Sequence, residues 1–307
     1  MKIAVTGATG LIGTKLCREL IKNGNSLVIF SGNADRAKKI IYGATEYIPW
    51  NYRNPDEWGY AMEGVDAVIH LAGANISEKR WSKKYKKEIF DSRKISTQNI
   101  VNVLRELKKK PGCFICSSGV NYYGDSGDKI LDENSGGGND FLAGVCAAWE
   151  EEAGKAAEFG VRTVSIRTGV VLSSEGGALP ELMLPFKLFA GGPIGSGKQW
   201  FPWIHIDDLV NIYLYVLKEG TIKHAVNAAA PNPVRMKEFA ATLGGKLKRP
   251  SFFKVPVFAL RIVIGESAEA VTASIRALPA KLTENGFKFK FEYLDRALHD
   301  IIIKKGP

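Results

Sequence analysis

The sequence contains no apolar run that could cross a membrane. Its longest apolar run, from Val255 to Gly265, falls short of the roughly 18 residues that a span needs, and Pro256 and Arg261 interrupt it. The first strand-like run begins at Lys2, which leaves no room for a secretion signal. We therefore expect a cytoplasmic protein that has no membrane partner.

Cysteine is also scarce, with four residues in 307. Cys113 and Cys116 form a CxxC motif, but they lie in an apolar segment typical of a buried strand, where residues three apart point to opposite faces. The sequence has no second cysteine pair that would complete a zinc site. We therefore expect reduced thiols and no metal.

The composition excludes a disordered or fibrous protein, because 45% of the residues are hydrophobic and 24% are charged. Basic residues outnumber acidic ones by 42 to 32, which gives a net charge of +10. Such an excess suits nucleic acid, an anionic membrane or a phosphorylated small molecule. The basic residues lack a nucleic-acid-binding motif and lie mainly on one predicted helix, so we expect an anionic small molecule and no nucleic acid.

From Lys2 to about Arg167, short β-branched runs alternate with stretches of helical spacing, which include Leu11–Lys22 and Ala147–Glu158. This alternation is typical of βαβ units and a mostly parallel sheet. The predicted strands are Lys2–Thr6, Ser26–Phe30, Thr45–Ile48, Ala67–Leu71, Cys113–Ser117 and Thr163–Arg167. The sequence therefore predicts an α/β protein with a Rossmann-like, doubly wound parallel sheet.

In the second half of the chain, the regular alternation of strand-like and helix-like segments ends. Glycine-rich and proline-rich loops at Ser173–Gly177 and Gly191–Gly197 interrupt the alternation, and we expect them to form a substrate lobe. They belong to a first domain over residues 1–235, with the lobe insertions beginning at about residue 173.

A separate C-terminal module is expected over residues 249–303. It begins with an apolar helix at Val257–Ile264, and a second helix starts at Pro279. Phenylalanines then alternate with lysines from Phe287 to Phe291, which predicts a short edge strand before a last helix.

The strongest local signal is the turn between the first predicted strand and the first predicted helix. Gly7, Gly10 and Gly13 have a GxxGxxG spacing. Glycine there permits a tight turn and close approach to a pyrophosphate, and the helix N-terminus offers N–H groups to the phosphates. The alternative is a structural glycine turn. We predict a dinucleotide site made by Gly7, Thr9, Gly10, Leu11, Ile12 and Gly13.

The second predicted strand ends without a carboxylate that would bind the adenosine ribose of NAD. Polar residues that can donate hydrogen bonds follow instead, and then three cations from Arg36 to Lys39. We therefore favour NADP(H) over NAD(H). The alternative is that these cations only solvate a helix face. The contacts expected here are Ser31, Gly32, Asn33 and Arg36.

Several separated motifs resemble one known superfamily. Thr6–Gly13, His70–Gly73 and Trp203–Leu209 resemble the extended short-chain dehydrogenase/reductases, to which sugar-nucleotide epimerases belong. Along nearly the whole chain, a narrower set looks like the atypical "epimerase family protein" group with its own C-terminal module. That set is Arg80-Trp81, Asp91-Ser92-Arg93, Tyr122-Tyr123-Gly124, Phe141-Leu142-Ala143, Trp149-Glu150, Gly191–Gly197 and Ala230–Pro233.

The resemblance implies further cofactor contacts. The residues after the fourth strand would line the adenosine and ribose side, and Arg93 with Glu88 would lie near the nicotinamide ribose and the phosphates. Relatives often carry an arginine in place of Gly32, and we expect Arg36 to replace it. The implied contacts are Leu71, Ala72, Gly73, Glu88, Arg93 and Cys146.

The superfamily's catalytic pair is missing. In a Tyr-x-x-x-Lys pair, the lysine lowers the tyrosine pKa so that the phenol exchanges a proton with substrate. Alignment on Trp149-Glu150 places the tyrosine position at Leu142 and the lysine position at Cys146, and neither can do this. Ser118 lies near the superfamily's carbonyl-polarising serine or threonine, and we take it as the catalytic candidate. The alternative is a strand-end serine bonded to backbone.

Other candidates have structural readings that we favour. Tyr122 and Tyr123 could supply a phenol, but a packing or wall role fits better. The His205 ring is expected to bond backbone while Asp207 or Asp208 caps the next helix. A loop with aromatic residues beside Lys187 and Gln199 is expected to enclose a ligand. Those aromatic residues are Phe186, Trp200 and Trp203.

Two functions therefore compete. The first is an NADP(H)-dependent epimerase or reductase of atypical mechanism that acts on a phosphorylated or nucleotide-linked small molecule. The alternative is a non-catalytic NADP(H)-binding sensor or scaffold, which the Leu142 and Cys146 substitutions favour. The resemblance also makes a homodimer plausible.

Overall fold

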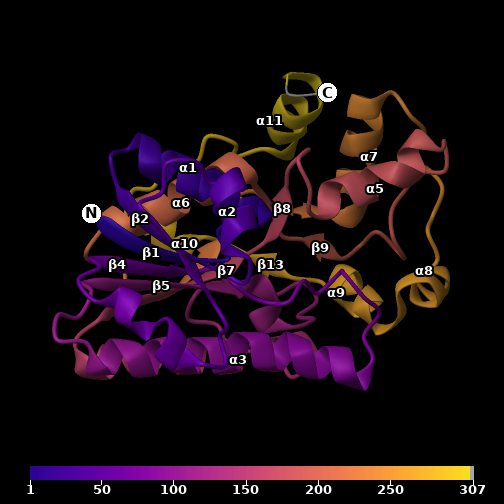
Figure 1. Ribbon diagram of the computed structural model, residues 1–307. Coiled ribbons are helices and arrows are strands. Elements are labelled where there is room, and N and C mark those ends of the chain that lie inside the picture. The colour runs from indigo at the N-terminus through magenta and orange to yellow at the C-terminus, as the bar shows by residue number, and fades with distance from the viewer. Residues whose placement is uncertain (305–307) are drawn as a thin grey trace.

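The computed structural model describes residues 1–304 and has a central seven-stranded sheet with helices on both faces (Figure 1). The strand order is β11-β7-β5-β4-β1-β2-β3, and every neighbouring pair is parallel. The order reverses beside β1, which confirms the doubly wound prediction. The strands are β1 Lys2–Thr6, β2 Ser26–Ser31, β3 Glu46–Pro49, β4 Ala67–His70, β5 Cys113–Gly119, β7 Arg162–Thr168 and β11 His224–Ala228.

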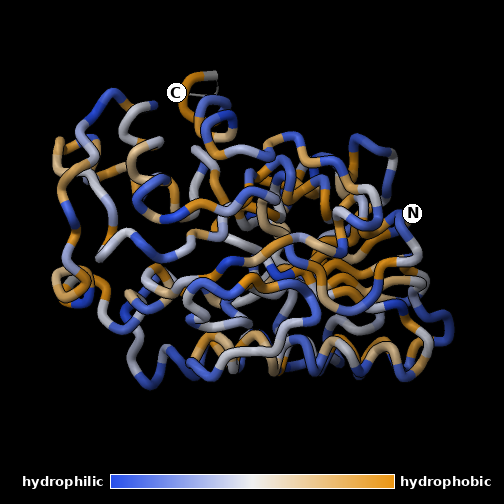
Figure 2. Tube along the Cα trace, turned by 180° about the vertical axis from the view of Figure 1, so that it is seen from behind, coloured by the Kyte–Doolittle hydropathy of each residue, from blue (hydrophilic) through white to orange (hydrophobic). Residues whose placement is uncertain are grey.

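Two hydrophobic layers sandwich this sheet. α1 (Leu11–Lys22) and α6 (Ile206–Lys218) cover one face, with α2 (Ala34–Ile40) beside them. α3 (Lys83–Glu106) and α4 (Phe141–Gly154) cover the other. Because both faces are buried, the strands are continuous apolar runs, and Figure 2 shows them as the most hydrophobic part of the chain.

The two faces account for the CxxC motif. Cys113 belongs to the core layer under α1 and α6, whereas Cys116 belongs to the layer under α3 and α4. Both cysteines are buried, free thiols on β5. The prediction that they point to opposite faces is confirmed.

Three small two-stranded sheets lie outside the central sheet, and each includes a strand from the second half of the chain. They pair β8 (Val170–Leu172) with β10 (Trp203–His205), β9 (Trp200–Phe201) with β12 (Val234–Arg235), and β6 (Ile130–Leu131) with β13 (Arg276–Ala277). The helices around them are α5 Ala178–Lys187, α7 Met236–Leu247, α8 Val257–Ile264, α9 Ala268–Thr272, α10 Ala280–Glu284 and α11 Leu294–His299. Short helical turns are η1 Pro55–Glu57, η2 Gly59–Met62, η3 Val120–Tyr123, η4 Lys155–Phe159, η5 Gly265–Ser267 and η6 Asp300–Lys304.

The edge strand expected from Phe287 to Phe291 does not form. Instead, the backbone N–H groups of Lys290 and Phe291 donate to the two carboxylate oxygens of Asp208, at 2.7 and 2.9 Å. Phe287 and Phe291 are buried beside α6 and α11. The alternating pattern therefore reflects burial against helices rather than pairing in a sheet.

The predicted helix at Ala147–Glu158 begins six residues earlier, at Phe141, because Asp140 caps it: the Asp140 carboxylate accepts a hydrogen bond from the Ala143 N–H at 2.9 Å. None of the helices within residues 1–304 combines the length and the apolar character that a membrane span requires.

Candidate functional site

The turn between β1 and α1 is closed too tightly for side chains. Gly7 has a φ of +69°, and a Cβ atom there would lie 2.7 Å from the Ala72 nitrogen. A Cβ on Gly13 would lie 2.3 Å from the Gly7 carbonyl oxygen. Glycine is therefore required at both positions, for the turn and for the approach of the helix. Gly10 caps α1 without a side chain, so the first N–H groups of the helix remain available to a ligand.

The segment after β4 lies directly against this turn. Leu71 and Ala72 contact Gly7, and Gly73 contacts the guanidinium of Arg93, because a Cβ on Gly73 would lie 3.0 Å from Arg93 Cζ. The structure thus brings together three groups that the sequence placed far apart: the glycine turn, the end of β4 and one cation of α3.

Arg93 is a largely buried cation. One Nη donates to the Ile89 carbonyl at 3.0 Å, and the guanidinium lies 5.0 Å from the centroid of the Trp149 ring. No carboxylate of the described chain pairs with it, and burial lowers its pKa from the ordinary value. An arginine stays charged even so. The site therefore holds a positive charge and unused N–H donors, which suit an anion.

The end of β2 is polar and partly committed to its own loop. The Ser31 hydroxyl donates to the Asn33 carbonyl at 3.1 Å, and the Asn33 side-chain oxygen caps α2 by accepting from the Arg36 N–H at 2.8 Å. The Asn33 amide nitrogen keeps its donors, and the Arg36 side chain is exposed at the first turn of α2. Gly32 is open, with only the Trp50 carbonyl near it.

No hydrogen bond or ion pair joins Glu88 to this group within residues 1–304. Glu88 is exposed on α3, whereas Arg93 is turned inward. Residues five apart on an α-helix are about 140° apart around the axis, so the two side chains leave different faces. The role of Glu88 as a cofactor contact therefore stays a prediction.

Leu142 and Cys146 are both buried on α4. Leu142 packs with Trp81 and Tyr85. Cys146 lies beside Gly119, whose added Cβ would be 3.7 Å from the thiol sulfur. Burial raises the pKa of the Cys146 thiol to about 11, although Arg93 opposes the shift. The thiol is therefore neutral near pH 7 and does not replace the missing lysine.

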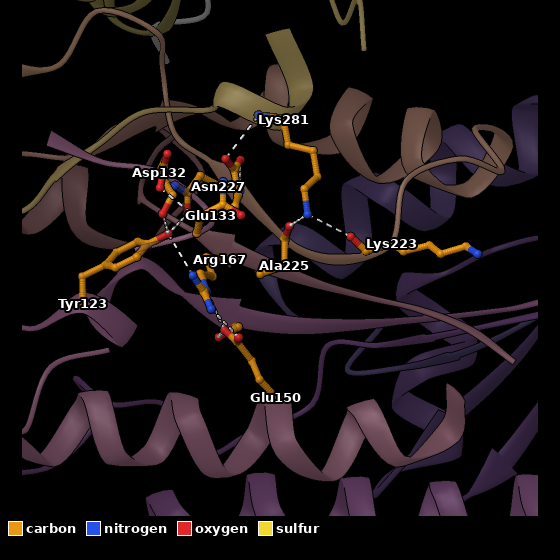
Figure 3. Close-up of polar contacts among 11 residues, drawn as sticks. Tyr123, Asp132, Glu133, Glu150, Arg167, Lys223, Ala225, Asn227 and Lys281 are labelled. Carbon is orange, nitrogen blue, oxygen red and sulfur yellow. Dashed lines mark hydrogen bonds and ion pairs between the residues drawn. The ribbon is translucent and has the colours of Figure 1, made fainter. Parts of the chain in front are cut away.

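Ser118 belongs to a buried polar network with Glu150 and Arg167, and Figure 3 shows the part of this network that runs from Glu150 through Arg167 to Tyr123. The Ser118 hydroxyl donates to Glu150 Oε1 at 2.7 Å. Arg167 donates to the same carboxylate through Nε at 2.9 Å and through Nη2 at 2.8 Å. The one proton of Ser118 is therefore directed to Glu150 and not to a substrate oxygen, while its lone pairs can still accept a hydrogen bond.

The network extends from Arg167 toward the C-terminal part of the chain (Figure 3). Arg167 Nη1 donates to the Tyr123 hydroxyl at 2.9 Å, and the Asn227 side-chain oxygen accepts from that hydroxyl at 2.7 Å. Glu133 then accepts from the backbone N–H groups of Asn227, at 2.9 Å, and Lys281, at 3.2 Å. Buried contacts thus join α4 to α10.

Both tyrosines of the Tyr122-Tyr123 motif are occupied by this network. Burial raises the pKa of Tyr123 to about 12, and its hydroxyl is held by Arg167 and Asn227. The Tyr122 ring lies under the Arg167 guanidinium, with 3.5 Å between Cζ and the ring centroid. These contacts favour the packing role over that of a phenol donor.

Sequence reasoning noted Trp149-Glu150 only as a motif and missed Arg167 and Asn227 altogether. The available signal was charge in apolar surroundings: Glu150 lies in a helix of mostly apolar residues, and Arg167 ends a β-branched strand. A buried charge needs a partner, so each of these positions predicted an opposite charge nearby.

Two adjoining cavities lie where the first half of the chain meets the C-terminal helices, and Asp125 and Thr272 line both. One has a volume of about 340 Å³, and its lining includes Ser196, Lys198, Gln199 and Arg235. The other has a volume of about 260 Å³, and its lining includes Trp81, Asn121, Leu142 and Arg261.

Gln199 of the loop expected to enclose a ligand lines the larger cavity, but none of the three aromatic residues lines either cavity. Phe186 and Trp203 are buried in the core of the second half, so that prediction is wrong for them. Trp200 is partly exposed, and the guanidinium groups of Arg235 and Arg276 lie 4.4 and 4.3 Å from the centroid of its ring.

His205 has the structural role that the sequence suggested, with one difference. Its Nδ1 accepts from the Asp207 N–H at 3.0 Å, so the histidine itself caps α6. Asp208 does not cap this helix, because its carboxylate binds the backbone at Lys290 and Phe291.

Comparison with known proteins identifies a family of NAD-dependent proteins. The sequence model of the NAD dependent epimerase/dehydratase family matches residues 3–229, and a second model, Domain of unknown function (DUF1731), matches residues 255–301. The chain is 41% identical to the chloroplastic "Epimerase family protein SDR39U1 homolog" of Arabidopsis thaliana, over 98% of this chain and 87% of that protein. It is 36% identical to "Epimerase family protein YfhF" of Bacillus subtilis, over 98% of both chains.

Solved structures agree with these matches. The crystal structure of human epimerase family protein SDR39U1 (isoform 2) with NADPH superimposes with a TM-score of 0.86 at 32% identity, over 98% of this chain and 99% of that one. UDP-glucuronic acid 4-epimerase from Bacillus cereus, at 18% identity and a TM-score of 0.79 over 98% of both chains, shares the fold. The chain therefore belongs to the NAD dependent epimerase/dehydratase family and, within it, to the SDR39U1-like epimerase family proteins.

Proposed function

We propose that this protein binds NADP(H) at the β1–α1 turn and acts as an epimerase-like or reductase-like enzyme on an anionic small molecule, phosphorylated or nucleotide-linked. The observation that carries the proposal is the glycine turn with a largely buried Arg93 beside it, which no carboxylate of the described chain pairs with. When bound, the nicotinamide supplies the hydride chemistry.

Each part of the cleft has a role in holding this cofactor. The N-terminal N–H groups of α1 and the Arg93 guanidinium would bind the phosphates. The backbone of Leu71, Ala72 and Gly73 would line the ribose side, and Cys146 would contribute a small neutral surface near the nicotinamide. Thr9, Leu11 and Ile12 would complete the turn around the pyrophosphate.

Discrimination between the two nicotinamide cofactors would come from the end of β2. A carboxylate there would repel a 2′-phosphate, and this chain has none between Phe30 and Asn33. The Asn33 amide and the exposed Arg36 offer donors to such a phosphate. The NADPH in the crystal structure of human SDR39U1 supports the same choice.

Substrate would occupy the two cavities. Lys198 and Arg235 place positive charge on the wall of the larger one, which suits a phosphate. Leu142, at the tyrosine position of the superfamily, lines the smaller one. An anion held by the larger cavity would therefore direct the rest of the molecule toward the cofactor side.

Proton transfer needs a group other than Leu142 and Cys146. We propose Ser118, with Glu150 as the acceptor of its proton. A substrate hydroxyl that donates to the free lone pair of Ser118 would be connected through the 2.7 Å bond to the Glu150 carboxylate. Arg167 would keep that carboxylate in place.

A second candidate function is a non-catalytic NADP(H)-binding sensor or scaffold. The burial and neutrality of Leu142 and Cys146 favour it, because the usual acid/base pair is absent. Both candidates share the cofactor and differ only in chemistry.

One experiment separates the two functions. Purified protein is incubated with NADP⁺ or NADPH and a broad panel of phosphorylated and nucleotide-linked metabolites. Absorbance of the reduced nicotinamide reports net oxidation or reduction, and NMR of the compounds reports epimers, because an epimerase returns the hydride and leaves that absorbance unchanged. An enzyme turns over at least one compound, and Ser118→Ala abolishes that turnover. Binding of NADPH without turnover of any compound, and without a gain in Leu142→Tyr/Cys146→Lys, would establish the sensor instead.

Three further proposals concern the whole chain. The separate family matches at residues 3–229 and 255–301 support a division into domains over 1–235 and 249–303. The four buried, free cysteines support a reducing compartment such as the cytoplasm. A homodimer rests on the superfamily resemblance.

A further inference from the structure

Large apolar side chains gather on the surface of the second half of the chain. They come from the end of α5 and the two residues after it, from the loop before α8, and from the outer face of α8, and they are between 47% and 73% exposed. We call this surface the apolar tip. Its members are Leu184, Leu188, Phe189, Phe252, Phe253, Phe258 and Ile262.

Contacts hold the segments of the apolar tip together. The Phe253 N–H donates to the Gly191 carbonyl at 3.2 Å, and the rings of Phe252 and Phe253 are 4.5 Å apart. The Arg249 guanidinium lies 4.4 Å from the Phe189 ring centroid. α5 and α8 both lie at the end of the molecule away from the sheet (Figure 1).

The charge of these segments has one sign. Residues 182–199 and 244–265 contain no aspartate or glutamate and seven lysines or arginines. Five of these cations are exposed around the apolar side chains: Lys187, Lys248, Arg249, Lys254 and Arg261. Only Arg261 of these five pairs with a carboxylate in the described residues, and its partner, Glu269, lies outside both segments.

This combination excludes some occupants on physical grounds. A second copy of the chain placed against the same surface would bring cations against cations, which opposes self-association. A protein partner fits less well, because protein interfaces are depleted in lysine at their centre. Exposed phenylalanine and leucine among lysine and arginine is the pattern that binds the headgroup region of an anionic bilayer.

We propose that the apolar tip docks the protein on the surface of an anionic lipid membrane. The phenylalanines would enter the boundary between headgroups and acyl chains, and the cations would bind lipid phosphates. This contact needs no spanning helix, so a search for long apolar runs does not detect it, and the expectation of no membrane partner holds only for spans.

Docking would also place the cavities near lipid. α8 presents Phe258 and Ile262 outward, while Val257 and Arg261 of the same helix line the two cavities. The membrane would therefore lie beside the entrance to the candidate substrate site.

The test is co-flotation of the full chain with vesicles, either equimolar phosphatidylglycerol and phosphatidylcholine or phosphatidylcholine alone. Two variants remove the two features separately. The apolar variant is Phe189→Ser/Phe252→Ser/Phe258→Ser, and the charge variant is Lys187→Gln/Lys248→Gln/Lys254→Gln. Matched controls change exposed residues elsewhere: Tyr42→Ser/Tyr60→Ser and Lys83→Gln/Lys84→Gln/Lys108→Gln.

We expect binding to the anionic vesicles that salt weakens and little binding to phosphatidylcholine. Each tip variant should lose about tenfold or more in partitioning, while both controls bind as the unmodified chain does. Far-UV circular dichroism and NADPH affinity verify that the variants are folded.

Three outcomes of the vesicle assay overturn the proposal. They are no binding to anionic vesicles at low ionic strength, an equal loss in the control variants, and full binding by the apolar variant, which would show only the attraction of a basic protein. Retention on a poly-glutamate resin without vesicle binding would also overturn it, in favour of an acidic protein partner.

Discussion

At the scale of single residues, Arg93 determines whether the cleft suits an anion. Its guanidinium is largely buried between Gly73 and Trp149, and the one hydrogen bond that it makes in the described chain goes to its own helix. Leaving a buried charge without a partner is costly, and a bound phosphate removes that cost. The empty cleft is therefore less stable than the liganded one.

Replacement of Arg93 by glutamine should weaken NADPH binding about 10-fold to 100-fold, because a charge-assisted hydrogen bond contributes about 1.5–3 kcal/mol. Isothermal titration calorimetry measures the dissociation constant. Arg105→Gln is the matched control, since it lies on the same helix and is exposed. Unchanged affinity in Arg93→Gln would contradict the role given to this residue.

His70 makes the fold sensitive to acid. It is fully buried, bonded to Thr6 at 2.6 Å and to Ser96 at 3.0 Å, and burial together with Arg93 lowers its pKa from 6.5 to about 3. Between pH 6.5 and pH 3, His70 therefore binds a proton in the unfolded chain and stays neutral in the folded chain. Stability is complete above pH 6.5 and falls as the pH drops toward 3.

Between pH 7.5 and pH 5.5, this one group should remove roughly 1 kcal/mol from the free energy of unfolding. Urea denaturation of the unmodified chain and of His70→Gln at both pH values measures the contribution. The variant should lose correspondingly less than the unmodified chain over this interval. Equal losses in both proteins would mean that His70 is protonated in the folded state.

At the scale of secondary-structure elements, the buried ion pair between α4 and β7 positions the catalytic candidate. Glu150 accepts from both Arg167 and Ser118, so it links the helix to the ends of β5 and β7. Removal of one partner leaves a buried charge, which is far more damaging than removal of both.

Arg167→Leu should therefore destabilise the fold by about 3–5 kcal/mol, whereas Arg167→Leu/Glu150→Leu should recover much of that loss. Chemical denaturation of the single and double variants measures both effects. Glu19→Ala, which removes an exposed pair with Lys22, should cost at most about 1 kcal/mol. An Arg167→Leu loss no larger than that of Glu19→Ala would contradict the account of a buried pair.

The elements themselves were largely predictable from sequence. α1 and α8 have the predicted bounds, and six of the seven sheet strands were predicted to within two residues, because strands buried on both faces are apolar runs that end at turn residues. The seventh strand, β11 at His224–Ala228, was not predicted. The alternation at Phe287–Phe291 led to the wrong prediction of an edge strand, since a period of two also arises when a loop packs on a helix. No local sequence pattern indicates that the Asp208 carboxylate accepts hydrogen bonds from the backbone N–H groups of Lys290 and Phe291.

Part of the candidate site was predictable from sequence and part was not. The glycine turn is recognisable from seven consecutive residues, because its glycine spacing is a local pattern. Contacts such as Arg167 with Glu150, or Lys281 with Glu133, join positions 17 and 148 residues apart. They depend on the register of β7 and on the return of α10, which no local pattern encodes.

At the scale of the whole molecule, the cofactor turn belongs to the first half of the chain, the apolar tip belongs to the second half, and residues of both halves line the cavities. Arg235 and Lys198 of the second half and Arg93 of the first give each region a cation for an anionic group. Cofactor and substrate would therefore meet between the two halves.

Titration of the folded protein with NADPH and then with NADH, followed by calorimetry, tests the central claim most directly. The account predicts saturable binding of NADPH, at least about tenfold tighter than that of NADH, because a 2′-phosphate gains charge-assisted hydrogen bonds at the end of β2. Absence of heat with both nucleotides, in a sample shown to be folded, would contradict the account, and tighter binding of NADH would contradict its cofactor assignment.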